Sequence, residues 1–90
     1  MKIIDFKTVS PLFEMERDGI KPFTVRRYEA DDARVDELFY WADSDGELRC
    51  RITNPATGES FTRRIIDWGW LSVQTMLLAD WYIIHFKKVD

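Results

Sequence analysis

Apolar and polar residues alternate along several short segments of this 90-residue chain. A period of two is typical of half-buried strands. The clearest case is Asp80–Lys88, where β-branched and aromatic residues fill both faces, so we expect this strand to be central. The pattern predicts strands at Lys2–Lys7, Lys21–Glu29, Leu38–Ala42, Leu48–Asn54, Glu59–Asp67 and Asp80–Lys88.

A short helix is predicted after the first strand. Ser10 and Pro11 favour a helix start, because serine can cap free amides and proline suits the first helical position. Leu12 and Met15, with Phe13 beside them, would form its apolar face. Gly19 stands where a left-handed cap would end the helix.

The connections between the later strands are read from their polar and turn-forming residues. Ala30–Asp36 is interpreted as a loop that can include one helical turn. Asp43–Gly46 ends in an Asp-Gly pair and predicts a tight turn, which would join Leu38–Ala42 and Leu48–Asn54 in a hairpin. Trp68–Ala79 is ambiguous between the end of a strand and a helical turn at Ser72–Leu78.

These elements predict one domain over residues 1–90, of the α+β class. We expect a small, strongly bent antiparallel β-barrel with one or two short helices packed on it. Hydrophobic residues make up 46% of the chain and aromatic residues 14%, which is enough for a core in so short a domain.

Charge and cysteine content narrow the possible functions. The net charge of -3 argues against a non-specific nucleic-acid binder, although it allows a pocket for a single nucleotide. Cys50 is the only cysteine, so no intramolecular disulfide forms, and no Cys/His cluster predicts a metal or other cofactor. The sequence shows no signal peptide and no apolar run of membrane-spanning length, so we expect a cytoplasmic location and no membrane partner.

The charges are unevenly distributed along the chain. The stretch Glu29–Glu47 holds eight acidic residues and a single basic one, Arg34. It is interpreted as a solvated acidic segment or, alternatively, as a surface for a basic protein partner. Four arginines follow on predicted neighbouring strands, namely Arg49, Arg51, Arg63 and Arg64. They would either form a face for RNA phosphate or form ion pairs with Glu47 and Glu59, and the ion pairs are slightly favoured.

Three segments resemble one known family. Asp18–Arg26 (DGIKPFTVR) is similar to the signature of the ASCH branch of PUA-like domains, which follows a short helix. Val35–Phe39 resembles the segment that leads into the next strand of that family, and Trp81–Lys87 resembles its closing strand. The order of elements agrees with this family over nearly the whole chain.

The resemblance implies a PUA-like β-barrel with a cleft near the junction of helix and strand. Members of this branch are associated with RNA or modified nucleosides, and some deacylate N4-acetylcytidine with a Lys, a Thr and a Glu. Lys21 and Thr24 match the family Lys and Thr, and Arg26 matches the Arg that closes the motif. We add Trp70 and Arg64 as further candidate ligand contacts, because indole rings stack on bases and guanidinium groups bind phosphate.

The chain departs from the family pattern at three places. Pro22 replaces a Thr and Val35 replaces a Gly, while Trp68–Ala79 holds no carboxylate where the family hydrolases carry their Glu. A hydrolase needs a group that activates water or protonates the leaving amine.

The departures favour binding over catalysis, and three hypotheses follow. The first is a binding module for RNA or a nucleoside-like ligand beside the motif. The second is a small amidohydrolase on an N-acylated nucleoside, with Lys21 and Thr24 as catalytic residues. The third is an acidic protein-binding or inhibitory factor, of the type found in phages and mobile elements.

Overall fold

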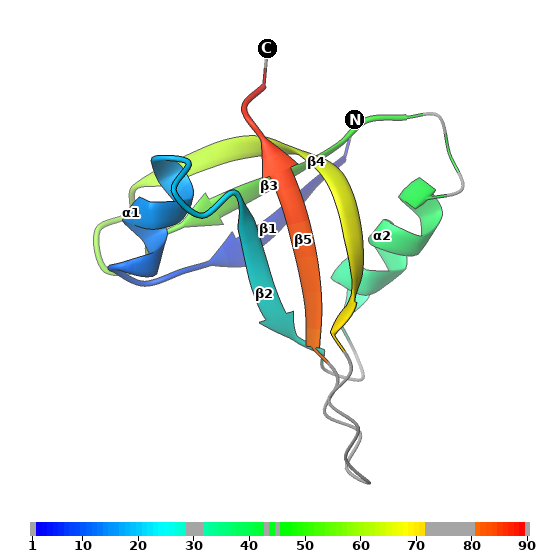
Figure 1. The fold of residues 1–90 in the computed structure, drawn as a ribbon, viewed down its shortest axis with the longest axis horizontal. Helices are drawn as coiled ribbons and strands as arrows, with labels where there is room; N and C mark the ends of the chain where they lie inside the picture. The colour runs from blue at the N-terminus through cyan, green and yellow to red at the C-terminus, as the bar shows by residue number, and fades with distance from the viewer. Residues whose placement is uncertain (1, 29–31, 43, 45, 72–80, 90) are drawn as a thin grey trace, which may run out of the picture.

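The computed structural model describes residues 2–28, 32–42, 44, 46–71 and 81–89. Five strands and two helices follow one another along this part of the chain (Figure 1). Their bounds are β1 (Lys2–Lys7), α1 (Leu12–Arg17), β2 (Phe23–Arg27), α2 (Ala33–Ala42), β3 (Leu48–Thr53), β4 (Ser60–Leu71) and β5 (Trp81–Lys87). The helix expected at Ser72–Leu78 lies outside the described residues.

The five strands form a single mixed sheet in the order β1-β3-β4-β5-β2. β1 and β3 are parallel, whereas the other three neighbouring pairs are antiparallel. A wholly antiparallel sheet was therefore the wrong expectation. The chain leaves β1, passes through α1, β2 and α2, and re-enters the sheet beside β1, and such a long crossover allows a parallel pair.

β4 bends the sheet into a curled half-barrel. Its first half pairs with β3 and its second half pairs with β5, and the register shifts between Ile65 and Asp67. An extra residue at such a bulge increases the local twist and bends the strand. The bend produces two layers. One layer contains β1, β3 and the start of β4, and the other contains the end of β4, β5 and β2. The two helices lie on opposite sides of these layers (Figure 1).

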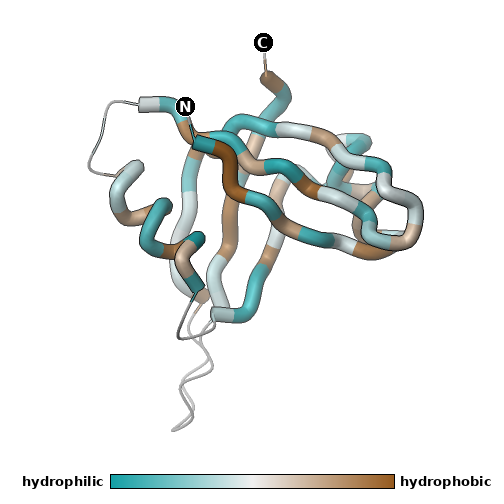
Figure 2. Tube along the Cα trace, turned by 180° about the vertical axis from the view of Figure 1, so that it is seen from behind, coloured by the Kyte–Doolittle hydropathy of each residue, from teal (hydrophilic) through white to brown (hydrophobic). Residues whose placement is uncertain are grey.

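The concave face of the half-barrel holds the core. Strand residues alternate between this face and solvent. Figure 2 shows hydrophobic and hydrophilic residues interspersed along the strands. Burying each large apolar side chain contributes about 1.5–3 kcal/mol. The core is formed by Ile4, Phe6, Phe13, Val35, Leu38, Leu48, Cys50, Ile52, Ile65, Tyr82, Ile84 and Phe86.

Most expected strands are confirmed, and β5 is an interior strand as predicted. The strand at Leu38–Ala42 and its hairpin are wrong, because these residues belong to helix α2. Val35 and Leu38, three positions apart, bury one helical face against the sheet. The helix ends where the indole nitrogen of Trp41 donates to the carbonyl oxygen of Gly46 at 3.0 Å.

Helix α1 buries a different face from the one the sequence indicated. Leu12 and Met15 are exposed, while Phe13 and Glu16 are fully buried. Gly19 has a φ of 81°, so the left-handed conformation predicted for it is confirmed. None of the helices in the described part of the chain is long and apolar enough to cross a membrane.

Candidate ligand-binding site

Four polar side chains meet where the two edges of the sheet face each other. We call this group the polar seam: Thr8, Glu16, Lys21 and Arg26. Glu16 is fully buried on α1, and it accepts hydrogen bonds from Lys21 Nζ at one oxygen and from Thr8 Oγ1, at 3.1 Å, at the other. Both carboxylate oxygens therefore have donors, as a buried charge requires.

Arg26 joins β2 to β1 across the open side of the half-barrel. Its Nη1 donates to the carbonyl oxygen of Lys7 at 2.7 Å, and its Nη2 donates to Thr8 Oγ1 at 2.5 Å. The guanidinium carbon lies 5.0 Å from the centroid of the Phe6 ring. Side chains, in place of a backbone ladder, thus connect the two edge strands.

Among the described residues, the guanidinium of Arg26 has no carboxylate as a hydrogen-bond partner. Its two described acceptors, a carbonyl and a hydroxyl, are neutral, and its buried Nε finds no acceptor among the described residues. Burial lowers the pKa of Arg26, because desolvation disfavours the charged form. The charged side chains of the seam are two cations and one anion, which leaves one net positive charge.

A second polar group lies on the other side of Phe6. Arg34 forms a bidentate pair with Asp32, at 2.8 and 3.0 Å, and its guanidinium carbon lies 4.8 Å from the Phe6 centroid. The hydroxyl of the buried Tyr82 donates to the same carboxylate at 2.9 Å. Burial raises the pKa of Asp32, but the hydrogen bonds from Arg34 and Tyr82 outweigh it and hold this pKa below its usual range.

The structure gathers three of the predicted site residues around the seam. Lys21, which is 16% exposed in its side chain, and Arg26 belong to it directly. Thr24 is buried on the concave face, opposite Ile84 of β5 and two positions from Arg26. Lys21 Nζ also lies 5.2 Å from the centroid of the Phe23 ring, so an aromatic side chain borders the exposed side of the seam.

The other two predicted contacts lie on β4. Trp70 shares a row across the sheet with Tyr82 and Arg26 and is 42% exposed. Its ring packs edge-on against Tyr28 at 5.3 Å. Arg64 lies at the other end of the pairing with β5, where it contacts Glu47 at 3.5 Å, and it is not part of the seam.

The remaining charged residues singled out in the sequence are mostly paired with each other. Glu47 contacts both Arg49 and Arg64, as expected, whereas Glu59 contacts Arg17 and Arg51 contacts Asp5. Within the acidic stretch, Asp32 pairs with Arg34 and Glu37 pairs with Lys2. Four of its other acids, Glu29, Asp31, Asp43 and Asp45, lie outside the described residues.

Glu16, like Thr8, is a residue of the polar seam that sequence reasoning missed. Its only signal was its spacing, three positions after Phe13 on the same helical face and five before Lys21. An acidic residue in a short helix is ordinarily read as exposed. The burial of Glu16 follows from its donors, which come from a strand end and a loop on either side of α1.

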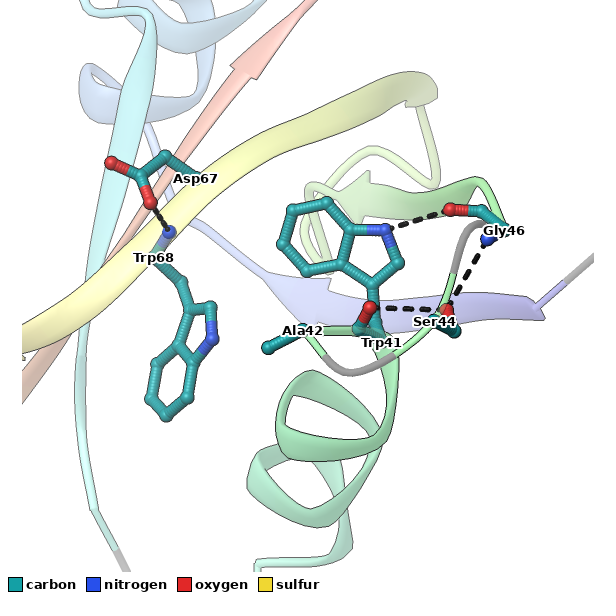
Figure 3. A pocket seen from close by; sticks show the side chains of 6 residues that line it. All are labelled: Trp41, Ala42, Ser44, Gly46, Asp67 and Trp68. Atoms are coloured by element: carbon teal, nitrogen blue, oxygen red, sulfur yellow. Dashed lines mark hydrogen bonds between the residues drawn. The ribbon is translucent and has the colours of Figure 1, made fainter.

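The structure also has a pocket of 440 Å³ between α2 and β4. Figure 3 shows Asp67 and Trp68 on β4 at one side of it and Trp41 and Ala42 of α2 at the other. Lys21, Thr24 and Arg26 do not line this pocket. It and the polar seam are therefore separate features of the half-barrel.

Among the described residues, no three His, Cys, Asp or Glu side chains lie close enough together to hold a metal ion. Comparison of the chain with family models, curated proteins and solved structures finds no match.

Proposed function

We propose that this chain is a binding module with a PUA-like, ASCH-type organisation, and that it takes RNA or a nucleoside-like ligand at the polar seam. The observation that carries the proposal is the state of Arg26. The guanidinium is half-buried, its described acceptors are neutral, and its Nε–H has no acceptor among the described residues; a ligand oxygen would explain this state.

The charges of the seam fit such a ligand. One net positive charge in a partly desolvated position attracts a phosphate or an acceptor-rich base edge. A ligand can contact Lys21, because part of its side chain is exposed while Glu16 is fully buried. The Phe23 ring beside it offers a surface for a base or sugar.

Ligand titrations with matched variants test this proposal. Cytidine, N4-acetylcytidine and a short single-stranded RNA are titrated into the labelled protein and followed by NMR and thermal shift. We expect saturable shifts at Lys21–Arg27 with at least one of these ligands, and at least a tenfold weaker affinity in Arg26→Lys, because lysine keeps the charge but loses the planar donor set. Arg51→Lys is the control, since Arg51 pairs with Asp5 at the surface.

Two results would refute the binding proposal. One is the absence of any shift at millimolar concentrations of all three ligands. The other is equal weakening by Arg26→Lys and Arg51→Lys, which would indicate a general charge effect and no specific role for the seam.

A second candidate function gains support from Glu16. Hydrolysis of an acyl amide needs water to attack the acyl carbon while the departing nitrogen takes a proton. The Lys21–Glu16 pair can hold and pass on that proton, and Glu16 supplies the carboxylate that Trp68–Ala79 lacks. Thr24, the family-matched residue, is nearly fully buried, so this activity requires the seam to open.

Mass spectrometry separates catalysis from binding. Incubation with N4-acetylcytidine would yield cytidine and acetate if the amidohydrolase proposal holds, and product would disappear in Lys21→Ala and Glu16→Gln. Saturable binding without product in the wild-type protein would support the binding module and reject the enzyme.

A further inference from the structure

The convex face of the β4–β5–β2 layer carries a regular grid of side chains. The strand register places nine residues in three rows across the strands: Asp67–His85–Phe23, Gly69–Ile83–Val25 and Leu71–Trp81–Arg27. Directly opposed residues of antiparallel strands share a face. The intervening residues Tyr82 and Ile84 are fully buried on the other side, which confirms that this grid points outward.

This outward face is unusually apolar, and apart from Asp67, which also lines the pocket beside α2, it is not covered by either described helix (Figure 1). The solvated side of an antiparallel sheet normally carries polar residues. Here Leu71 and Trp81 are 43% and 39% exposed, and Phe23, Val25 and Ile83 are half-buried beside them. An apolar patch rimmed by charges is typical of an interaction surface.

The positions of the charges indicate which partner fits. Asp67 and Arg27 are the two formally charged residues of the grid, and they occupy opposite corners. A two-fold axis along the other diagonal, from Leu71 through Ile83 to Phe23, would exchange these corners between two copies of the chain. Each copy would then place its Asp67 against Arg27 of the other, so the face is complementary to itself.

We propose that this face binds a second copy of the chain, with the strands of the two layers crossing at nearly a right angle. Orthogonal crossing is one of the two common ways in which sheets pack face to face. The same symmetry places Trp81 of each copy over Gly69 of the other. Apart from its two chain neighbours, an added Cβ at Gly69 would meet no heavy atom within 4 Å, so the surface here is open and has room for an indole ring.

The area of the grid limits the affinity that we expect for the dimer. Three strands about 4.8 Å apart and five residues at about 3.4 Å each cover roughly 14 by 17 Å. This is well below the roughly 800 Å² per partner of a standard interface. The dimer should therefore be weak and reversible, dissociating on the order of 100 µM.

A glycine substitution gives the sharpest test. Sedimentation and NMR spectra of the full chain are recorded from about 20 µM to 1 mM, and we expect a monomer–dimer equilibrium with concentration-dependent shifts confined to the grid. Gly69→Val occupies this open space without a clash inside the subunit and should weaken the dimer at least tenfold, with a dispersed, folded spectrum. A monomer throughout this range, or an unweakened dimer in Gly69→Val, would overturn the proposal.

A charge exchange tests the orientation of the two copies. Arg27→Glu and Asp67→Lys should each weaken the dimer several-fold, and the double variant should restore it because the pair is re-formed with reversed signs. Arg51→Glu, the same change on another strand, should leave the dimer unchanged. Failure of the double variant to restore association, or equal weakening by Arg51→Glu, would contradict the proposed symmetry.

Discussion

Arg26 of β2 donates a hydrogen bond to the carbonyl oxygen of Lys7 at the end of β1, and this contact joins the two edges of the curled sheet. The edges belong to strands that are not neighbours in the sheet, so the closure depends on side chains. The same guanidinium contacts Thr8 and lies over Phe6, which ties it to the β1 edge at three points.

Removing this arginine should destabilise the fold. Hydrogen bonds to charged groups contribute about 1.5–3 kcal/mol, so Arg26→Ala should lower the free energy of unfolding by about that amount. Urea denaturation followed by tryptophan fluorescence measures the loss. Arg51→Ala, which removes an exposed ion pair, should cost clearly less; equal losses would mean that Arg26 does not hold the edges together.

The buried Glu16–Lys21 pair should show strong coupling. Lys21→Met leaves the fully buried carboxylate without its cation and should cost about 3–5 kcal/mol. The double variant Glu16→Leu/Lys21→Met removes both charges, so it should be more stable than Lys21→Met alone. Denaturation of the two variants decides the question, and a double variant at least as unstable as Lys21→Met would contradict the pairing.

Acid stability should depend on Asp32. The folded-state pKa of Asp32 lies below the unfolded value of ~4, so its contribution to stability is complete above that pH and is lost as the pH falls through the folded pKa. Tyr82→Phe removes one of the donors and should therefore reduce the loss of stability on acidification. Tyr40→Phe, at an exposed position, serves as the control and should titrate like the wild-type protein.

Cys50 should be chemically silent in the folded protein. Burial raises the pKa of its thiol to about 12, so thiolate is scarce at pH 8 and a reagent has no access to the sulfur. Labelling by a thiol reagent should occur only through unfolding and should accelerate with urea in step with the denaturation curve. Rapid labelling without denaturant would contradict the packing around β3.

The sequence predicted the strands better than the helices because their signals differ in strength. β1, β3 and β5 alternate over six or seven residues, and the burial of alternate residues confirms that period. The apolar run at Leu38–Trp41 has neither a clear period of two nor one of 3.6, so its β-prone aromatic residues suggested a strand. The sheet resolved this ambiguity, since only a helix buries Val35 and Leu38 on one side.

The candidate site was predictable in part. Lys21, Thr24 and Arg26 were found through one local motif, and the structure does bring Lys21 and Arg26 into one cluster. Glu16 and Thr8 were missed because their roles depend on contacts between α1, β1 and β2, which no local pattern encodes. Arg64 was added from charge alone, and the structure pairs it with Glu47 away from the seam.

The side-chain Nε–H resonance of Arg26, followed by NMR during titration with N4-acetylcytidine and with short single-stranded RNA, tests the proposed binding site most directly. This group is buried and lacks a described acceptor, so its signal should move when a ligand oxygen reaches the seam. We expect a saturable shift that matches the backbone shifts of Lys21–Arg27 and is absent for the Nε–H of Arg51. An unchanged Arg26 signal at ligand concentrations that shift other parts of the protein would place binding elsewhere and contradict the proposed function.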